Sequence, residues 1–228
     1  DLHRVDRRQR QMCIRDSLYR AIRYAPRKVW AAYCGFGNTK ADYHRIRDEY
    51  KPKLLIERAA RTLYLNRTCF KGMWRHNRDG HFNVGYGGQE RRWVITEEDL
   101  VFCATALRGV TLKCQDFQPI IEQAEKGDFI FLDPPYRPGH KECSNSHYIW
   151  HQFKYSDYER LANSLQCAKS RHVQWAMTIS SHEDILRLLK GNYVLRIPRG
   201  TGKMPGILTS ESGEVLITSY AIEGGKKL

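Results

Sequence analysis

The sequence predicts an α/β protein with a smaller helical region ahead of its sheet, and three observations carry this prediction. Strand-length apolar segments alternate with helix-length amphipathic segments from residue 96 onward. One of them, 129–132, reads Phe-Ile-Phe-Leu, as expected for a strand whose two faces are both covered in a parallel sheet. The first 80 residues are strongly basic and lack the alternation. This order of elements is typical of a Rossmann-type sheet.

The N-terminal region is expected to be mostly helical. Apolar residues recur there at helical spacing, and they include Leu54, Leu55, Ala59 and Leu63. After Asn66 the chain becomes rich in glycine, which indicates irregular structure. We therefore expect a small helical subdomain followed by a loop or a hairpin.

The first elements of the sheet region begin at Thr96, a helix cap followed by three acidic residues. This helix is expected to run to Leu107 and to end at Gly109. The elements expected next are a short strand over 110–112, a helix over 119–124 and the strand over 129–132.

The pattern of helix and strand then repeats. Ser156 and Glu159 form a predicted capping box for a helix that reaches Cys167, and Ser181 is expected to cap another helix. The strands expected in this part are 173–179, 193–197 and 214–220.

Composition and charge narrow the class of protein. A hydrophobic content of 41% in 228 residues favours a packed domain over disorder. No apolar run is long enough to span a membrane, and the seven scattered cysteines form no CxxC pair, which is typical of a reducing cytoplasm. The net charge is +13, of which residues 1–80 contribute +12. A basic part of this kind predicts a polyanionic partner, although a merely soluble basic surface is the alternative.

The motif Asp133-Pro134-Pro135-Tyr136 follows the strand 129–132 directly. Ligands of open α/β sheets bind beyond the carboxyl ends of the strands, so the motif lies where chemistry is expected. The prolines stiffen the backbone, Asp133 supplies a fixed acceptor, and Tyr136 supplies a flat face. These groups suit an exocyclic amine on a planar base. The alternative is a proline turn after a core strand.

With these residues the chain resembles the Dam-type DNA adenine-N6 methyltransferases over about residues 17–222. The similarity rests on several blocks: 57–87, 129–136, Tyr148 with Phe153, 179–182 and 214–220. It implies a Rossmann-like fold, methyl transfer from S-adenosylmethionine to N6 of a flipped adenine in double-stranded DNA, and a bacterial or phage-infected cell. Such enzymes also act in restriction–modification systems.

The resemblance also implies roles for individual residues. Asp133 and the Pro134 carbonyl would bind the target amine, and Tyr136 would stack on the flipped base. Asp116 and Phe117, together with Asp133, fall at cofactor-binding positions. An acidic and an aromatic residue in sequence can read an amine and stack on a purine, but Asp-Phe pairs are common on protein surfaces.

The block 57–87 contains the residues expected to contact DNA, which are Arg67, Phe70, Lys71, Met73, Arg75 and Asn83. Arginine can read guanine, apolar side chains can contact a thymine methyl, and an aromatic ring can wedge into the base stack. The resemblance implies that Phe70 is the wedge and that Arg75 reads guanine. A solvated charge or a phosphate contact is the alternative for each arginine. The family usually has Asn at the position of Lys71 and Pro at that of Gly85, so GATC recognition is a hypothesis.

We expect three parts: an unmatched segment 1–17, a recognition region 18–95 and a catalytic α/β region 96–228. Residues 11–17 resemble translated sequencing-adapter read-through, so we interpret the first segment as artefactual. The first strand and the glycine-rich cofactor loop of the family are expected to be missing. The segment 35–37 (Gly-Phe-Gly) is rejected as that loop because no buried strand precedes it.

Other functions are compatible with parts of the sequence. A DNA-binding remnant without catalysis is the first alternative, and an RNA or small-molecule methyltransferase is another. A zinc site would use the Cys and His residues between 140 and 151, namely His140, Cys143, His147 and His151. Their spacing matches no standard finger, so no metal is expected, and no stable protein partner is implied.

Overall fold

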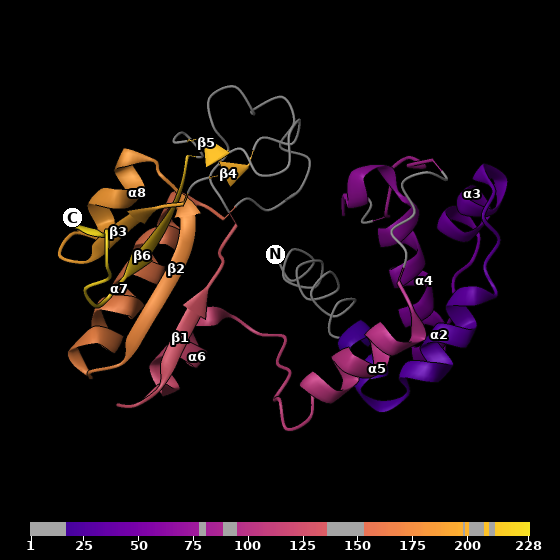
Figure 1. Cartoon of the computed structure of the whole chain (residues 1–228), viewed down its shortest axis with the longest axis horizontal. Helices are drawn as coiled ribbons and strands as arrows, with labels where there is room; N and C mark the ends of the chain where they lie inside the picture. The colour runs from indigo at the N-terminus through magenta and orange to yellow at the C-terminus, as the bar shows by residue number, and fades with distance from the viewer. Residues whose placement is uncertain are drawn as a thin grey trace. The chain divides into compact units, whose positions relative to one another are not determined.

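The computed structural model describes residues 17–77, 81–88, 95–135, 153–197 and 213–228, together with the short strands at 199–200 and 208–209. The chain divides into two compact units, Asp1–Gln115 and Asp116–Leu228. Figure 1 labels the helices and strands of each unit. Each unit has its own hydrophobic core.

The first unit is helical, as expected for this region. Its helices are residues 17–24, α2 (Pro26–Cys34), α3 (Lys40–Asp48), α4 (Leu55–Thr68) and α5 (Glu97–Ala106). A capping box starts α3, since the Thr39 hydroxyl accepts from the Asp42 N–H and the Asp42 carboxylate accepts from the Thr39 N–H. Thr96 and Asp99 form the same box at α5, which confirms the predicted cap.

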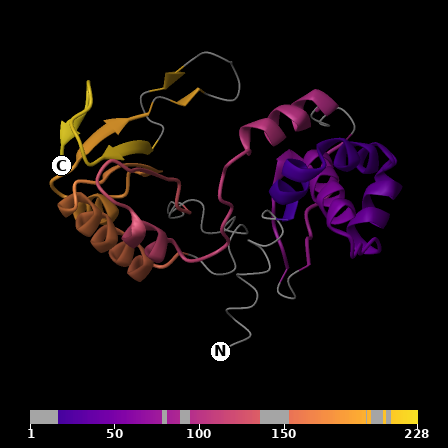
Figure 2. The same ribbon diagram turned by 90° about the horizontal axis from the view of Figure 1, so that it is seen from below.

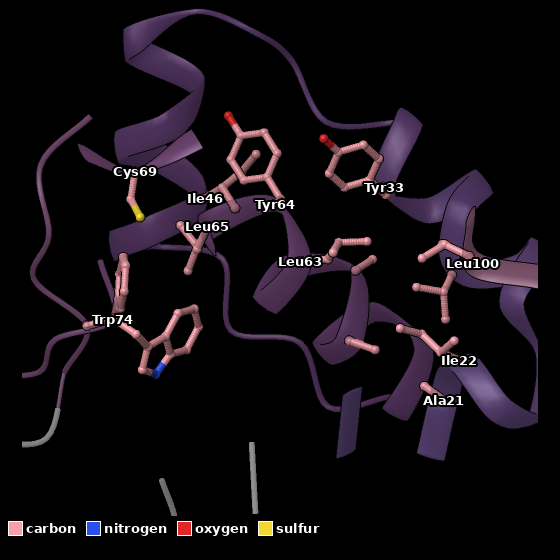
Figure 3. Close-up of a cluster of buried hydrophobic side chains, with 14 of the residues drawn as sticks. Ala21, Ile22, Tyr33, Ile46, Leu63, Tyr64, Leu65, Cys69, Trp74 and Leu100 are labelled. Carbon is pink, nitrogen blue, oxygen red and sulfur yellow. The ribbon is translucent and has the colours of Figure 1, made fainter. Parts of the chain in front are cut away.

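Helix α4 lies at the centre of this core. It contributes the buried residues Leu63, Tyr64 and Leu65, and it packs against α2 and α3. Figure 3 shows the cluster, with Cys69 and Trp74 at one end and Leu100 at the other. Because Leu100 of α5 is buried here, α5 belongs to the first compact unit, which ends at Gln115.

A hairpin-like segment (residues 69–77 and 81–88) follows α4. We call it the recognition hairpin after the role that the sequence analysis expects of it. Its two arms are joined by the antiparallel bridges Cys69↔Tyr86 and His76↔Phe82. A single 3-10 turn, η1 (Phe70–Gly72), begins the first arm. The alternative of a loop or a hairpin is thus resolved as an irregular hairpin.

The second unit contains a five-stranded sheet in the order β1-β2-β6-β3-β7. Its elements are α6 (Phe117–Gln123), β1 (Phe129–Leu132), α7 (Tyr155–Ser170), β2 (Gln174–Ser180), α8 (Glu183–Leu188), β3 (Tyr193–Arg196), β6 (Glu214–Thr218) and β7 (Lys226–Lys227). Strands β4 (Arg199–Gly200) and β5 (Leu208–Thr209) form a separate pair. β1 is parallel to β2, whereas β6 is antiparallel to both of its neighbours.

The described helices of this unit do not cover both faces of the sheet. Figure 2 shows α6 and α7 together on one side of the strands, and the buried side chains of α6, α7 and α8 belong to one cluster. Phe129 and Phe131 point to the other side and are 55% and 62% exposed. The expectation that β1 is buried on both faces is therefore wrong for the described residues.

Three local expectations also differ from the structure. Residues 110–112 form no strand, and the Val110 N–H and carbonyl bond to the Leu107 carbonyl and the Arg23 guanidinium. Ser156 and Glu159 do not form the expected capping box of α7. The helix begins earlier, at Tyr155, where the Asp157 carboxylate accepts from the Lys154 N–H. Ser181 does not cap α8. Its N–H donates to a carbonyl next to β6, so the backbone is already engaged with the sheet.

Candidate active site and recognition hairpin

Asp133 lies at the carboxyl end of β1, beside the end of β2. The parallel register pairs Leu132 with Met177, so the next residues along the two strands, Asp133 and Thr178, are neighbours. The Thr178 hydroxyl donates a hydrogen bond of 2.9 Å to Oδ1 of Asp133. The Asp133 residue is exposed, and Oδ1 is the carboxylate oxygen that the Thr178 hydroxyl engages.

The prolines after Asp133 are held from the helical layer. Tyr158 of α7 donates its hydroxyl proton to the Pro135 carbonyl at 2.5 Å. The Tyr158 side chain is only 4% exposed, and its ring packs edge-on against Phe153 with centroids 4.7 Å apart. The loop of residues 133–135 is thus tied both to β2 and to α7.

Asp116 and Phe117 begin helix α6, and a single arginine of α7 engages both. Asp116 is the helix cap, since its Oδ1 accepts from the Gln118 N–H at 2.9 Å. Arg160 donates to Oδ1 and Oδ2 of Asp116 at 2.8 and 3.0 Å, and its guanidinium lies 4.4 Å from the centre of the Phe117 ring. The hydrogen bond to Asp116 raises the pKa of Arg160. This planar pairing fixes the start of α6 on α7.

Sequence reasoning did not find Arg160, Thr178 or Tyr158. Arg160 lies 44 residues from Asp116, and Thr178 lies 45 residues from Asp133. The only local signal was the spacing of Asp157 and Arg160, which form an ion pair of 3.2 Å on one helix face.

Two of the residues expected to contact DNA bind each other in the recognition hairpin. Arg75 donates from Nε to Oδ1 of Asn83 at 2.9 Å and from Nη2 to the Asn83 carbonyl at 3.3 Å. These bonds use one edge of the guanidinium. Its end-on edge, formed by Nη1 and Nη2, carries further N–H donors in a plane that Asn83 holds.

Phe70 and Lys71 lie at the strained turn of the same hairpin. Phe70 is 41% exposed, and the Lys71 ammonium lies 5.4 Å from the centre of its ring. Lys71 has φ of 55° and Gly72 has φ of 66°, so two consecutive residues adopt the left-handed conformation. A residue other than glycine is uncommon in this conformation.

The last two recognition residues are less accessible. Met73 packs against the core of the first unit, and its carbonyl accepts from the Cys69 thiol at 3.1 Å. Arg67 is half-buried, and its Nε has no hydrogen-bond partner in the part of the chain that the structure describes. Met73 is therefore part of the packing of the first unit, whether or not it also contacts DNA.

Some expected residues lie outside the described ranges. Tyr136 and Tyr148 are among them, as is the whole stretch that holds His140, Cys143, His147 and His151. Within the described ranges, no group of three or more His, Cys, Asp or Glu residues could hold a metal ion. None of the helices there combines the length and hydropathy that a membrane crossing requires. The segment 35–37 connects α2 with α3 in the first unit, where the Gly37 carbonyl accepts from Tyr64.

Comparison with known proteins matches residues 14–200 to the family described as D12 class N6 adenine-specific DNA methyltransferase. The DNA N-6-adenine-methyltransferase of Escherichia phage P1 is 35% identical over 153 residues, which are 66% of this chain and 20% of that protein. The Type II methyltransferase M.MjaIII of Methanocaldococcus jannaschii is 28% identical over 69% of the chain and 56% of its own length. The DNA adenine methylase of Haemophilus influenzae is 31% identical over 64% of the chain and 51% of its own length. The chain therefore spans a fifth of the phage protein and about half of the other two.

Proposed function

Because the chain belongs to the D12 class N6 adenine-specific DNA methyltransferase family, we propose that it methylates adenine N6 in double-stranded DNA. Its mixed α/β unit with a five-stranded sheet is consistent with the fold of S-adenosylmethionine-dependent methyltransferases. The observation that carries the proposal is the loop of residues 133–135, held beyond the carboxyl end of β1 by β2 and α7. A Rossmann-like arrangement is part of the same proposal.

The chemistry follows from the acceptors of this loop. The exocyclic amine of adenine has two N–H donors, and Asp133 and the Pro134 carbonyl supply two acceptors for them. Hydrogen bonds from both N–H groups to these acceptors turn the nitrogen lone pair toward the incoming methyl group and stabilise the positive charge that develops on nitrogen. The new N–C bond forms as the methyl–sulfur bond breaks, and the amine releases its extra proton to water after transfer. Tyr136 is proposed to stack on the flipped base.

The residues at the start of α6 fit the adenosine part of the cofactor. Oδ1 of Asp116 accepts from the Gln118 N–H and from Arg160, and Oδ2 accepts from Arg160, so the carboxylate is fixed in place as an acceptor at the start of α6. Phe117 is half-buried and retains an apolar surface beside that carboxylate. We propose that these two residues, with Asp133, bind S-adenosylmethionine. When bound, this cofactor supplies the methyl group.

We propose that the recognition hairpin reads the DNA, with GATC as the candidate site. Arg75, held by Asn83, retains an end-on pair of donors suited to O6 and N7 of guanine. Phe70 is exposed at a strained turn and suits the role of a wedge during base flipping. In this proposal the first unit selects the target and the second unit carries the catalytic groups.

The test is transfer of labelled methyl from S-adenosylmethionine to two duplexes, one with GATC and one with that site scrambled. Labelling that requires GATC supports the enzyme and the site, and Asp133→Ala should abolish it while duplex binding remains. Equal labelling of both duplexes refutes the GATC assignment alone. Duplex binding without any labelling refutes the proposed activity and favours a DNA-binding chain without catalysis.

A further inference from the structure

The loop of residues 133–135 is held at both of its ends by side chains to which the proposed reaction assigns no role. We propose that Thr178 and Tyr158 are positioning residues, which present Oδ2 of Asp133 and the Pro134 carbonyl together as the acceptors of the target amine. This inference rests on the proposed function and adds the residues that make the motif rigid.

Thr178 fixes the carboxylate. A hydroxyl has one proton to donate, and the Thr178 hydroxyl lies 2.9 Å from Oδ1 of Asp133 and 3.5 Å from the Leu132 carbonyl oxygen, so the shorter bond, to the carboxylate, takes the proton. Thr178 lies within β2, which pairs with β1 on one side and with β6 on the other. A donor on such a strand has little freedom, so the carboxylate rotates little about its last bond. Oδ1 is occupied, and Oδ2 is the oxygen left for a ligand.

Tyr158 fixes the backbone. The ring of Pro135 already restricts its φ, and the bond from Tyr158 to its carbonyl restricts its ψ. The peptide group between Pro134 and Pro135 is thereby oriented as well. Since Tyr158 is almost fully buried and packs edge-on against Phe153, the hydroxyl itself is held firmly.

The acceptor between the two ties is the Pro134 carbonyl. Neither proline has an N–H to donate, and the described residues make no hydrogen bond to the Pro134 carbonyl. The arrangement therefore offers two acceptors at the end of β1, each next to a group that is tied down. An amine with two protons is the ligand that satisfies both.

The experiment compares matched variants of the full chain, with unmethylated genomic DNA as substrate so that no target site is assumed. Thr178→Val removes the hydroxyl at nearly constant shape, and Thr178→Ser restores it. Tyr158→Phe removes the other hydroxyl, and Tyr155→Phe, at a 44% exposed position of the same helix, is its control. The rate kcat, the KM for DNA and the thermal midpoint are measured for each.

We expect Thr178→Val and Tyr158→Phe each to lower kcat about tenfold, the effect of losing one hydrogen bond that positions an acceptor of the target amine, with KM for DNA unchanged. Thr178→Ser and Tyr155→Phe should retain most of the rate. Equal rates for Thr178→Val and Thr178→Ser overturn the inference, as does a loss that appears in KM or in the thermal midpoint alone. If the wild-type chain labels no DNA, the proposed function fails and the inference fails with it.

Discussion

Gly87 is the point at which the recognition hairpin is most sensitive to a single methyl group. A Cβ added there would lie 2.5 Å from the Cys69 carbonyl oxygen and 2.8 Å from its carbonyl carbon. Both are backbone atoms, which no side-chain rotation can move away. Gly85, two residues earlier, has nothing within 4 Å of the same added atom, so Gly85→Ala is a matched control.

The magnitude follows from the contacts around Gly87. Ordinary contact begins at 3.4 Å, so the two arms must separate by about 0.9 Å. Two backbone bonds cross this point, from Gly87 N–H to the Thr68 carbonyl and from Phe70 N–H to the Gly85 carbonyl, each 2.8 Å long. At about 1 kcal/mol for each bond, Gly87→Ala should lower the free energy of unfolding of the first unit by about 2 kcal/mol. Gly85→Ala should instead raise it by about 0.5 kcal/mol, because alanine restricts the unfolded chain.

Two assays check this difference. Urea denaturation measures the free energy of unfolding, and amide hydrogen exchange follows the Phe70 N–H directly. A loss of about 2 kcal/mol corresponds to about thirtyfold faster exchange of that amide in Gly87→Ala. If the two alanine variants have the same stability and the same exchange rate, the close approach of the hairpin arms is not what holds them together.

Three further outcomes are expected. Arg160→Ala removes both hydrogen bonds to Asp116, so the Kd for S-adenosylmethionine, measured by calorimetry, should rise about tenfold. Arg187→Ala breaks the exposed ion pair with Glu183 and should leave the Kd unchanged. Equal affinities of the two variants contradict the cofactor role of Asp116. Lys71→Asn should raise the free energy of unfolding in urea by about 0.5 kcal/mol, because asparagine tolerates a positive φ better than lysine; a fall would show that Lys71 makes stabilising contacts. Burial raises the pKa of the Cys69 thiol from 9.0 to about 11, so the folded state favours the protonated thiol. The resulting contribution to the free energy of unfolding, about 2–3 kcal/mol, is complete below pH 9 and is lost as the pH rises toward 11. Cys69→Ala should abolish this loss of stability at high pH, and a loss that persists in the variant belongs to another group.

Local signals in the sequence predicted local structure well. Thr96 caps α5 as expected, and the structure adds that it forms a capping box with Asp99, because a cap depends on only four consecutive residues. The apolar spacing around Leu63 predicted α4, and the apolar run 129–132 predicted β1. Burial of that strand was overestimated, since Phe131 lies on a face that none of the described helices covers. A continuous apolar run predicts a strand, but it does not show which helices or loops pack on each face of that strand.

The sequence alone determined the alternation of helices and strands, the placement of Asp133 after a strand and the resemblance to a methyltransferase family, because each is encoded in contiguous residues. Only the tertiary structure decided which side chains support those residues. Thr178 reaches Asp133 through the register of two parallel strands, and Arg160 reaches Asp116 through the packing of two helices. Such pairs join residues more than 40 positions apart. Their contacts depend on how strands and helices align in space, and no periodicity or motif within one segment contains that alignment.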